Sequence, residues 1–163
     1  NIDYRGVLYA GLMITPDGDF KVLEFNCRFG DPETQVILPL LETPLEELML
    51  ACIEQRLAQM PPIAWKQGAA ATVVAAALGY PGTYEKGKAI AGIAEAQAAG
   101  AIVFHAGTKL QDQQLLTDGG RVLNVTGTGE NFEQALAQAY VGMRCINFEG
   151  MYYRRDIGHR LKG

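Results

Sequence analysis

Three side chains that can bind metal and phosphate recur at every second position, at Glu24, Asn26 and Arg28. The surrounding stretch is apolar and predicts a β-strand, whose successive side chains point to opposite faces, so we expect these three on one face. Mg²⁺ takes hard oxygen ligands and completes its shell with water and substrate phosphates, while a guanidinium can hold a phosphoryl or carboxylate group bidentately. The residue types are those of a metal- and phosphate-binding face. The solvated face of an ordinary amphipathic strand shows the same alternation, so spacing alone leaves both interpretations open.

The residues after this strand predict the start of a helix. Gly30 permits a tight turn, Asp31 can cap a helix, and Pro32 suits the first helical position. Free backbone N–H groups at a helix N-terminus favour anions. We therefore expect the strand to run directly into an anion-binding helix end.

A β-hairpin must position the polar face. Residues 7–14 and 20–25 read as apolar strands, and the segment between them contains Pro16, Asp17 and Gly18, which favour a turn. The two strands are expected to pair antiparallel.

Two helices are predicted after the hairpin. The first runs from Pro32 and stops around Pro39, since proline is poorly tolerated deep inside a helix. The second begins at Thr43, with Pro44 as its first helical residue and Glu46 completing a Thr-x-x-Glu capping box. Its expected apolar face consists of Leu45, Leu48, Met49, Cys52 and Leu57.

The run Met60-Pro61-Pro62-Ile63 interrupts the pattern and predicts a boundary between residues 1–62 and 63–163. Beyond it, we expect strands at 69–78, 101–106, 114–117 and 121–127, and a helix at 128–145. The apolar side of that helix would carry Phe132, Leu136, Tyr140 and Met143. The fold class is therefore predicted as α+β: antiparallel strands with helices, followed by a small mixed α/β domain.

Several motifs, in order along the chain, resemble the phosphoribosylamine–glycine ligase family, also called glycinamide ribonucleotide synthetases. They lie at residues 9–13, 23–35, 79–82, 104–108, 119–123 and 152–158. The resemblance implies that residues 1–62 are the C-terminal part of an ATP-grasp domain and that residues 63–163 are the small C-terminal domain of the ligase. Family members are several hundred residues long, so it also implies that the rest of the ligase chain, with its lysine-bearing ATP lobe, is missing here.

The implied reaction joins glycine to 5-phosphoribosylamine in de novo purine biosynthesis, with ATP as co-substrate and glycyl phosphate as intermediate. By the resemblance, Mg²⁺ or Mn²⁺ is the cofactor, Glu24 and Asn26 are its ligands, and Arg28 is the catalytic residue against the transferring group. The implied substrate-binding residues, for glycine or the ribose phosphate, are Gly30, Asp31 and Glu33.

One position departs from the wider ATP-grasp pattern. Many relatives carry another metal-binding carboxylate about a dozen residues before Glu24, whereas this chain has Leu12 there. The number of metal ions therefore stays open.

Composition fits a cytoplasmic globular protein, with 48% hydrophobic and 20% charged residues and a net charge of −4. The chain is not basic enough to suggest nucleic acid as a partner, and no apolar run is long enough to suggest a membrane. Cys27, Cys52 and Cys145 are scattered and form no CxxC pair, which argues against disulfides or a zinc site and predicts reduced, mostly buried thiols.

Two other functions stay open. A different ATP-grasp carboxylate–amine ligase, or a carboxylase making carboxyphosphate, would share the three polar residues of the strand. Alternatively, the isolated chain is an inactive docking module that binds ATP weakly or not at all. Two further features are expected to be structural: His105, and the Gly127-Thr128-Gly129 run, which we interpret as a plain turn into a helix.

Overall fold

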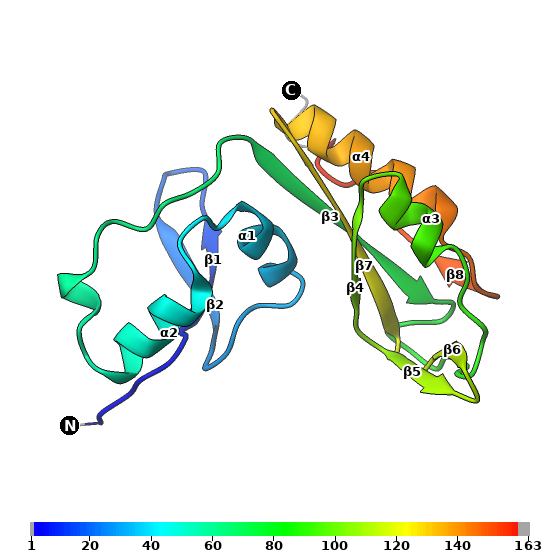
Figure 1. The fold of residues 1–163 in the computed structure, drawn as a ribbon, viewed down its shortest axis with the longest axis horizontal. Helices are drawn as coiled ribbons and strands as arrows, with labels where there is room; N and C mark the ends of the chain where they lie inside the picture. The colour runs from blue at the N-terminus through cyan, green and yellow to red at the C-terminus, as the bar shows by residue number, and fades with distance from the viewer. Residues whose placement is uncertain (1, 160–163) are drawn as a thin grey trace. The chain divides into compact units, whose positions relative to one another are not determined.

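The computed structural model describes residues 2–159 and divides the chain into two compact units (Figure 1). One unit contains residues 1–34 and 41–66, and the other contains residues 35–40 and 67–163. The α+β class predicted from the sequence is confirmed, because both units combine antiparallel strands with helices. The proposed domain limit at residue 62 stays a prediction.

The predicted hairpin of the first unit is confirmed. Strands β1 (Tyr9–Ile14) and β2 (Phe20–Asn26) pair antiparallel. In the turn between them, the N–H of Thr15 donates to the carbonyl oxygen of Asp19 (2.8 Å) and the N–H of Gly18 donates to that of Thr15 (3.0 Å). Gly18 has φ +87°, a left-handed conformation that glycine adopts without steric cost. The turn chemistry of the sequence thus produces the hairpin.

Helix α1 (Thr34–Leu40) starts later than predicted. The backbone N–H and the hydroxyl of Thr34 both donate to the carbonyl oxygen of Gly30 (3.2 and 2.5 Å), which closes a turn over residues 30–34 before the helix begins. The predicted start at Pro32 is therefore two residues too early, and Pro32, whose peptide bond with Asp31 is cis, lies in this turn. The helix ends one residue after Pro39, close to the predicted stop.

The predicted capping box of helix α2 (Leu45–Ile53) is wrong. The Thr43 hydroxyl accepts a hydrogen bond from the backbone N–H of Ala64 (2.8 Å), and the carbonyl oxygen of Ala64 accepts from the N–H groups of Glu42 and Thr43. The returning chain therefore occupies the oxygen that would have capped the helix, and Pro44 stands at the N-cap position.

The predicted apolar face of α2 is only partly covered. Leu45, Leu48 and Cys52 are half-buried, but Met49 and Leu57 are each 50% exposed. Leu57 lies outside the helix, in the 3-10 turn η1 (Leu57–Gln59).

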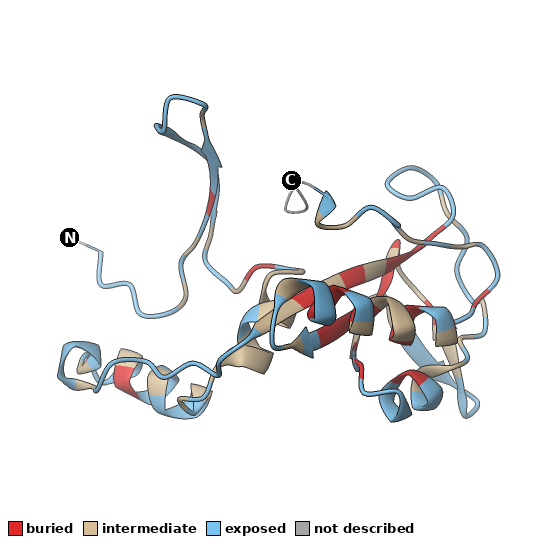
Figure 2. Cartoon of the chain, turned by 90° about the horizontal axis from the view of Figure 1, so that it is seen from above, coloured by how far each residue is buried: buried red, intermediate tan, exposed pale blue. Residues whose placement is uncertain are grey.

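The second unit is built on a four-stranded antiparallel sheet in the order β4 (Ile102–His105), β7 (Arg121–Gly129), β3 (Ala69–Ala77) and β8 (Met151–Tyr152). Three of these strands coincide with predicted ones. Helices α3 (Ile93–Ala98) and α4 (Phe132–Cys145) pack together, and α4 lies on β3 and β7. Figure 2 shows the buried residues along the sheet and the helices that cover it. The core includes Val73, Ala75, Leu123, Val125 and Met143.

Strand β7 continues through the segment that was predicted to be a turn and the start of a helix. Gly127 and Gly129 belong to β7, and α4 begins only at Phe132. The helix cap is Asn131, whose side chain accepts a hydrogen bond from the N–H of Gln134 (3.0 Å). The predicted apolar side of α4 is confirmed, since Leu136 and Met143 are buried and Phe132 and Tyr140 are half-buried.

Three elements of the second unit were not predicted, and one of them is the short strand β8. Strand β5 (Thr108–Gln111) forms a hairpin with the predicted strand β6 (Gln114–Thr117), and α3 forms within an Ala-rich segment. The β5–β6 turn places Asp112 and Gln113 at φ +48° and +61°. Positive φ at both turn residues is typical of a two-residue hairpin turn. The usual sequence signal for such a turn is Asn-Gly or a similar pair, and Asp-Gln does not provide it.

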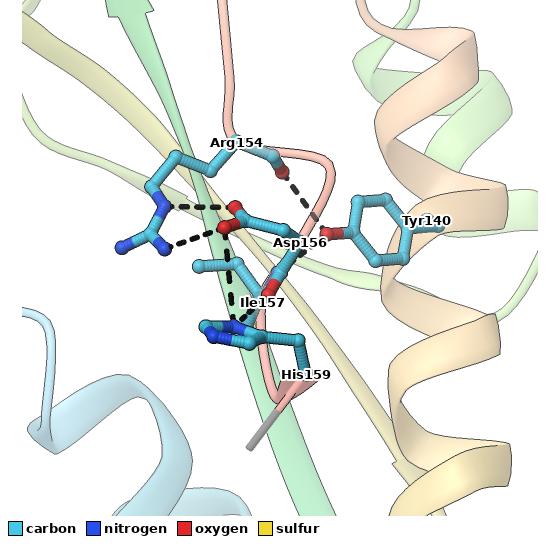
Figure 3. A network of polar contacts seen from close by, with 5 residues as sticks. All are labelled: Tyr140, Arg154, Asp156, Ile157 and His159. Carbon is cyan, nitrogen blue, oxygen red and sulfur yellow. Dashed lines mark hydrogen bonds and ion pairs between the residues drawn. The ribbon is translucent and has the colours of Figure 1, made fainter. Parts of the chain in front are cut away.

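The segment after the sheet is fastened to α4 through Tyr140 (Figure 3). The Tyr140 hydroxyl donates to the carbonyl oxygen of Arg154 (3.0 Å) and accepts from the backbone N–H of Ile157 (3.2 Å). The Arg154 guanidinium in turn donates two hydrogen bonds of 2.9 Å to the Asp156 carboxylate. His159 is exposed and lies beside the same carboxylate, as expected for a solvated residue near the end of the chain.

The three cysteines are free, as predicted, but the expectation of buried thiols is wrong. Cys27 is exposed, and Cys52 and Cys145 are half-buried. No helix within residues 2–159 is long and apolar enough to cross a membrane. His105 is exposed, and its Nδ1 lies 3.0 Å from the Thr108 hydroxyl, a local contact that agrees with a structural role.

Candidate functional site

The hairpin register places Glu24 and Asn26 on one face, as strand alternation predicts. Asn26 pairs with Tyr9 and Glu24 pairs with Gly11, and directly paired residues in an antiparallel ladder project to the same side. A Cβ atom at Gly11 would lie 3.1 Å from Cγ of Glu24, so glycine there leaves room for the carboxylate side chain. We call the side that carries Tyr9, Gly11, Glu24 and Asn26 the polar face.

A β-bulge makes this face more polar than simple alternation would. Gly11 pairs with Glu24 but the next residue, Leu12, pairs with Val22, so Leu23 is an extra residue in β2. Strict alternation along β2 would put Val22 on the face of Glu24. The bulge shifts the phase, and Val22 shares the opposite face with Leu12.

The same register shows where Leu12 lies, the position at which the ATP-grasp pattern has another carboxylate. Leu12 does not face Glu24; the residue directly across from Glu24 is Gly11. Within the described hairpin, β1 therefore presents no acidic side chain to Glu24.

Arg28 does not continue the strand, which corrects the expectation that it projects from the same strand face. Strand β2 ends at Asn26, and Arg28 lies in a bend. Its Nη1 donates to the carbonyl oxygen of Phe29 (2.7 Å). The hydrogen bond to Glu33 raises the pKa of Tyr9, and the positive charge of Arg28 opposes that shift, so the guanidinium lies within electrostatic range of the Tyr9 hydroxyl.

Gly30 and Glu33 are close together in the turn before α1. Gly30 is buried, and a Cβ atom there would lie 3.0 Å from Cβ of Glu33 and closer still to the Glu33 carboxylate. Gly30 therefore allows Glu33 to fold back over the turn. Asp31 is exposed and lies in the same turn.

Sequence reasoning missed Tyr9 as a member of the site. Its hydroxyl donates to Oε1 of Glu33 (3.1 Å), which links β1 to the turn. This hydrogen bond is the main cause of a raised pKa at Tyr9; burial and the charges of Glu33 and Glu24 raise it further. The only sequence signal was that Tyr9 stands on the strand paired with β2, and the bulge conceals which residue it faces.

The oxygen donors of Glu24 and Asn26 fit a hard divalent cation whose remaining ligands are water and phosphate oxygens. Glu24 is exposed, and among residues 2–159 its carboxylate has no hydrogen bond or ion pair. Asn26, which offers an amide oxygen, lies two residues further along the same face, and Mg²⁺ commonly takes one or two protein ligands with the rest from phosphate and water. Within that same range, no three His, Cys, Asp or Glu residues cluster closely enough to hold a metal ion by themselves. The site fits Mg²⁺ or Mn²⁺ bound together with a phosphate ligand, and not a closed zinc site.

Comparison with known families agrees with this geometry. Residues 1–34, which contain the polar face and the turn, match the family described as "Phosphoribosylglycinamide synthetase, ATP-grasp (A) domain". Residues 70–160 match "Phosphoribosylglycinamide synthetase, C domain". The chain thus combines part of an ATP-grasp (A) domain with a C domain of the phosphoribosylglycinamide synthetase type.

The relatives narrow that class. The chain is 76% identical over 161 residues to a phosphoribosylamine–glycine ligase of Nostoc sp., covering 98% of this chain and 38% of that protein. It is 57% identical over 159 residues to the trifunctional purine biosynthetic protein adenosine-3 of Gallus gallus, covering 98% of this chain and 16% of the relative. The crystal structure of the Thermotoga maritima phosphoribosylamine–glycine ligase superposes with a TM-score of 0.78 at 43% identity, over 91% of this chain and 36% of that one.

The chain therefore belongs to the phosphoribosylglycinamide synthetase family. It spans well under half the length of the relatives it matches.

Proposed function

We propose that this chain is the C-terminal part of an ATP-dependent ligase that joins glycine to 5-phosphoribosylamine, forming glycinamide ribonucleotide, ADP and phosphate in de novo purine biosynthesis. The observation that carries the proposal is the polar face, where Glu24 and Asn26 lie side by side within the segment that matches an ATP-grasp domain. The 76% identity to a phosphoribosylamine–glycine ligase supports the choice of substrates.

In this proposal, Glu24 and Asn26 hold Mg²⁺ or Mn²⁺. The bound ion would neutralise charge on the phosphates of ATP. The register supports these roles, since it places two residues with oxygen donors on the same face of the hairpin.

Arg28 is proposed as the catalytic residue next to the transferring phosphoryl group. The glycine carboxylate attacks the γ-phosphate to give glycyl phosphate, and the amine of phosphoribosylamine then displaces phosphate to form an amide. Both steps gather negative charge, which a planar guanidinium stabilises through parallel hydrogen bonds. In the structure one Arg28 nitrogen donates to the Phe29 carbonyl, which leaves its remaining N–H groups for a ligand.

Gly30, Asp31 and Glu33 are proposed to help bind substrate. Gly30 supports the turn, because its carbonyl oxygen accepts two hydrogen bonds from Thr34. Glu33 and Asp31 bring carboxylates, which suit the ammonium group of glycine better than a phosphate.

The other parts of the ligase chain are the proposed partners of both units, because the curated relatives are longer. The proposed compartment is the cytoplasm, because cysteines stay reduced there and all three cysteines of this chain are free.

The test is ADP release by the complete parent ligase, with phosphoribosylamine generated in situ. ADP release should require glycine and phosphoribosylamine, and Glu24→Ala should abolish it without unfolding the protein, since the exposed carboxylate has no packing role. Glu47→Ala, on the exposed part of α2, is the matched control and should retain full activity. Bicarbonate replaces glycine in a parallel assay. ADP release with bicarbonate and not with glycine would favour a carboxylase, and full activity of Glu24→Ala would remove Glu24 from the metal site.

A further inference from the structure

The hydrogen bond between Tyr9 and Glu33 joins two parts of the site that are distant in sequence. Tyr9 lies on β1 directly across from Asn26, so it stands beside one of the two proposed metal ligands. Glu33 lies in the turn before α1. The 3.1 Å contact between the Tyr9 hydroxyl and Oε1 of Glu33 therefore fixes the turn relative to the polar face.

The two oxygens of the Glu33 carboxylate have different surroundings. Oε1 accepts the hydrogen bond from Tyr9, whereas Oε2 lies over Gly30, at a place that a Cβ atom would occupy. Within the described part of the chain, Oε2 has no hydrogen-bond donor. One oxygen is thus held in place and the other keeps its capacity to accept.

The Tyr9 hydroxyl donates to Glu33 as a neutral group, because a phenol ordinarily keeps its proton near pH 7. Glu33 and Glu24 raise the pKa of Tyr9 and Arg28 lowers it, so all three lie within electrostatic range of the hydroxyl. A tyrosine that keeps its proton continues to donate to Glu33 throughout the neutral range. Glu33 therefore keeps its orientation without needing a positive partner of its own.

We propose that Tyr9 is a positioning residue that holds the Glu33 carboxylate as the binding site for the ammonium group of the amino-acid substrate. This inference rests on the proposed function and assigns glycine, and not the ribose phosphate, to the turn. A carboxylate attracts an ammonium group and repels a phosphate. The glycine carboxylate would then point toward the proposed metal ligands Glu24 and Asn26, where it must be activated.

The experiment uses the complete ligase and four variants: Tyr9→Phe, Glu33→Gln, the double variant and Tyr4→Phe. Tyr9→Phe removes only the hydroxyl, and Glu33→Gln keeps an acceptor for Tyr9 but loses the charge. Tyr4→Phe is the matched control, because the Tyr4 hydroxyl donates to the carbonyl oxygen of Val7 (2.6 Å) in the same unit and has no hydrogen bond to Glu33. KM is measured for glycine and for ATP, and thermal unfolding reports whether each variant is folded.

Tyr9→Phe should raise KM for glycine about ten-fold, the effect expected for loss of one hydrogen bond to a charged group, while KM for ATP stays within about two-fold. Glu33→Gln should raise KM for glycine further. The double variant should resemble Glu33→Gln alone, because Tyr9 acts through Glu33. Inhibition by glycolate, which carries a hydroxyl in place of the ammonium group, should be unaffected by Glu33→Gln.

Three results would overturn the inference: an unchanged KM for glycine in Tyr9→Phe, a parallel rise of KM for ATP, or equal weakening of glycine and glycolate in Glu33→Gln. Each of these leaves the proposed function standing if the wild-type enzyme releases ADP in a glycine-dependent manner. Glycine-independent ADP release by the wild-type enzyme would overturn the proposed function and this inference together.

Discussion

Gly127 of strand β7 lies against the backbone of Ala135 in helix α4 so closely that no side chain fits between them. A Cβ atom at Gly127 would also lie 2.8 Å from Cβ of Gln138, one turn further along the helix. Sheet and helix are therefore in backbone-to-backbone contact at this point. The buried Ala135 and Ala139 on the helix extend the same close approach.

This contact predicts that Gly127→Ala destabilises the second unit. The added methyl group must push β7 and α4 apart, and overpacking of this kind costs about 2 kcal/mol. Urea unfolding followed by circular dichroism measures the loss. Thr128→Ala, the exposed neighbour on β7, is the control and should change the free energy of unfolding by less than about 0.5 kcal/mol. Equal stability of the two variants would show that α4 moves away freely.

Tyr140→Phe should loosen the segment that follows the sheet. The substitution keeps the ring but removes the donor to Arg154 and the acceptor for Ile157. We expect a loss of about 1–2 kcal/mol, and faster cleavage after residue 153 in limited proteolysis. Tyr152→Phe serves as control, because Tyr152 is 57% exposed. Unchanged proteolysis in Tyr140→Phe would mean that packing of the segment is sufficient to hold it.

Asp156 predicts a weak acid dependence of stability. The hydrogen bonds from Arg154 lower the pKa of Asp156 below its ordinary value of 3.8. A folded-state pKa below the unfolded one gives stability that is complete above the unfolded pKa and is lost as the pH falls through the folded pKa. The unfolding midpoint should therefore fall less between neutral pH and pH values below about 4 in Asp156→Asn than in the wild type. High salt should have the same effect as the substitution, because the Arg154–Asp156 pair is exposed. An identical acid profile in both proteins would exclude this pair as a contributor.

Asn26→Ala should raise the Mg²⁺ concentration needed for half-maximal activity of the complete ligase. Loss of one of the two protein oxygens should weaken binding of the ion more than binding of ATP. We therefore expect the half-maximal Mg²⁺ concentration to rise about ten-fold, with activity restored at high Mg²⁺. Chelation with EDTA should abolish activity in both proteins, and added Mn²⁺ should restore it. If Mg²⁺ dependence is the same in variant and wild type, Asn26 is not a ligand.

Most of the longer strands were predictable because they have a short apolar run bounded by turn residues, whereas the short strands β5 and β8 were not predicted. β3 is an example: Gly68 precedes it and Gly79 follows it, so a continuous run of small and β-branched residues resolves as a buried strand. The positions of Glu24 and Asn26 on one face followed from strand alternation alone.

Helix starts and caps were less predictable, because they depend on competition for hydrogen-bonding groups. Nothing near Thr43 in the sequence shows that its hydroxyl will accept a hydrogen bond from the backbone N–H of Ala64. Likewise, Gly127 and Gly129 at the end of β7 lie close to α4, and the pairing of Tyr9 with Asn26 depends on a bulge. Each involves residues that the local pattern treats as independent.

The extra residue Leu23 separates the hairpin into two stretches with independent phase. The stretch next to the turn can change its length or its sequence without rotating Glu24 and Asn26, because the bulge absorbs the shift in register. Insertions between Thr15 and Asp19 should therefore be tolerated, whereas removal of Leu23 would exchange the two faces of one stretch relative to the other. Changes in length should thus be better tolerated at the turn end of the hairpin than at the end that carries Glu24 and Asn26.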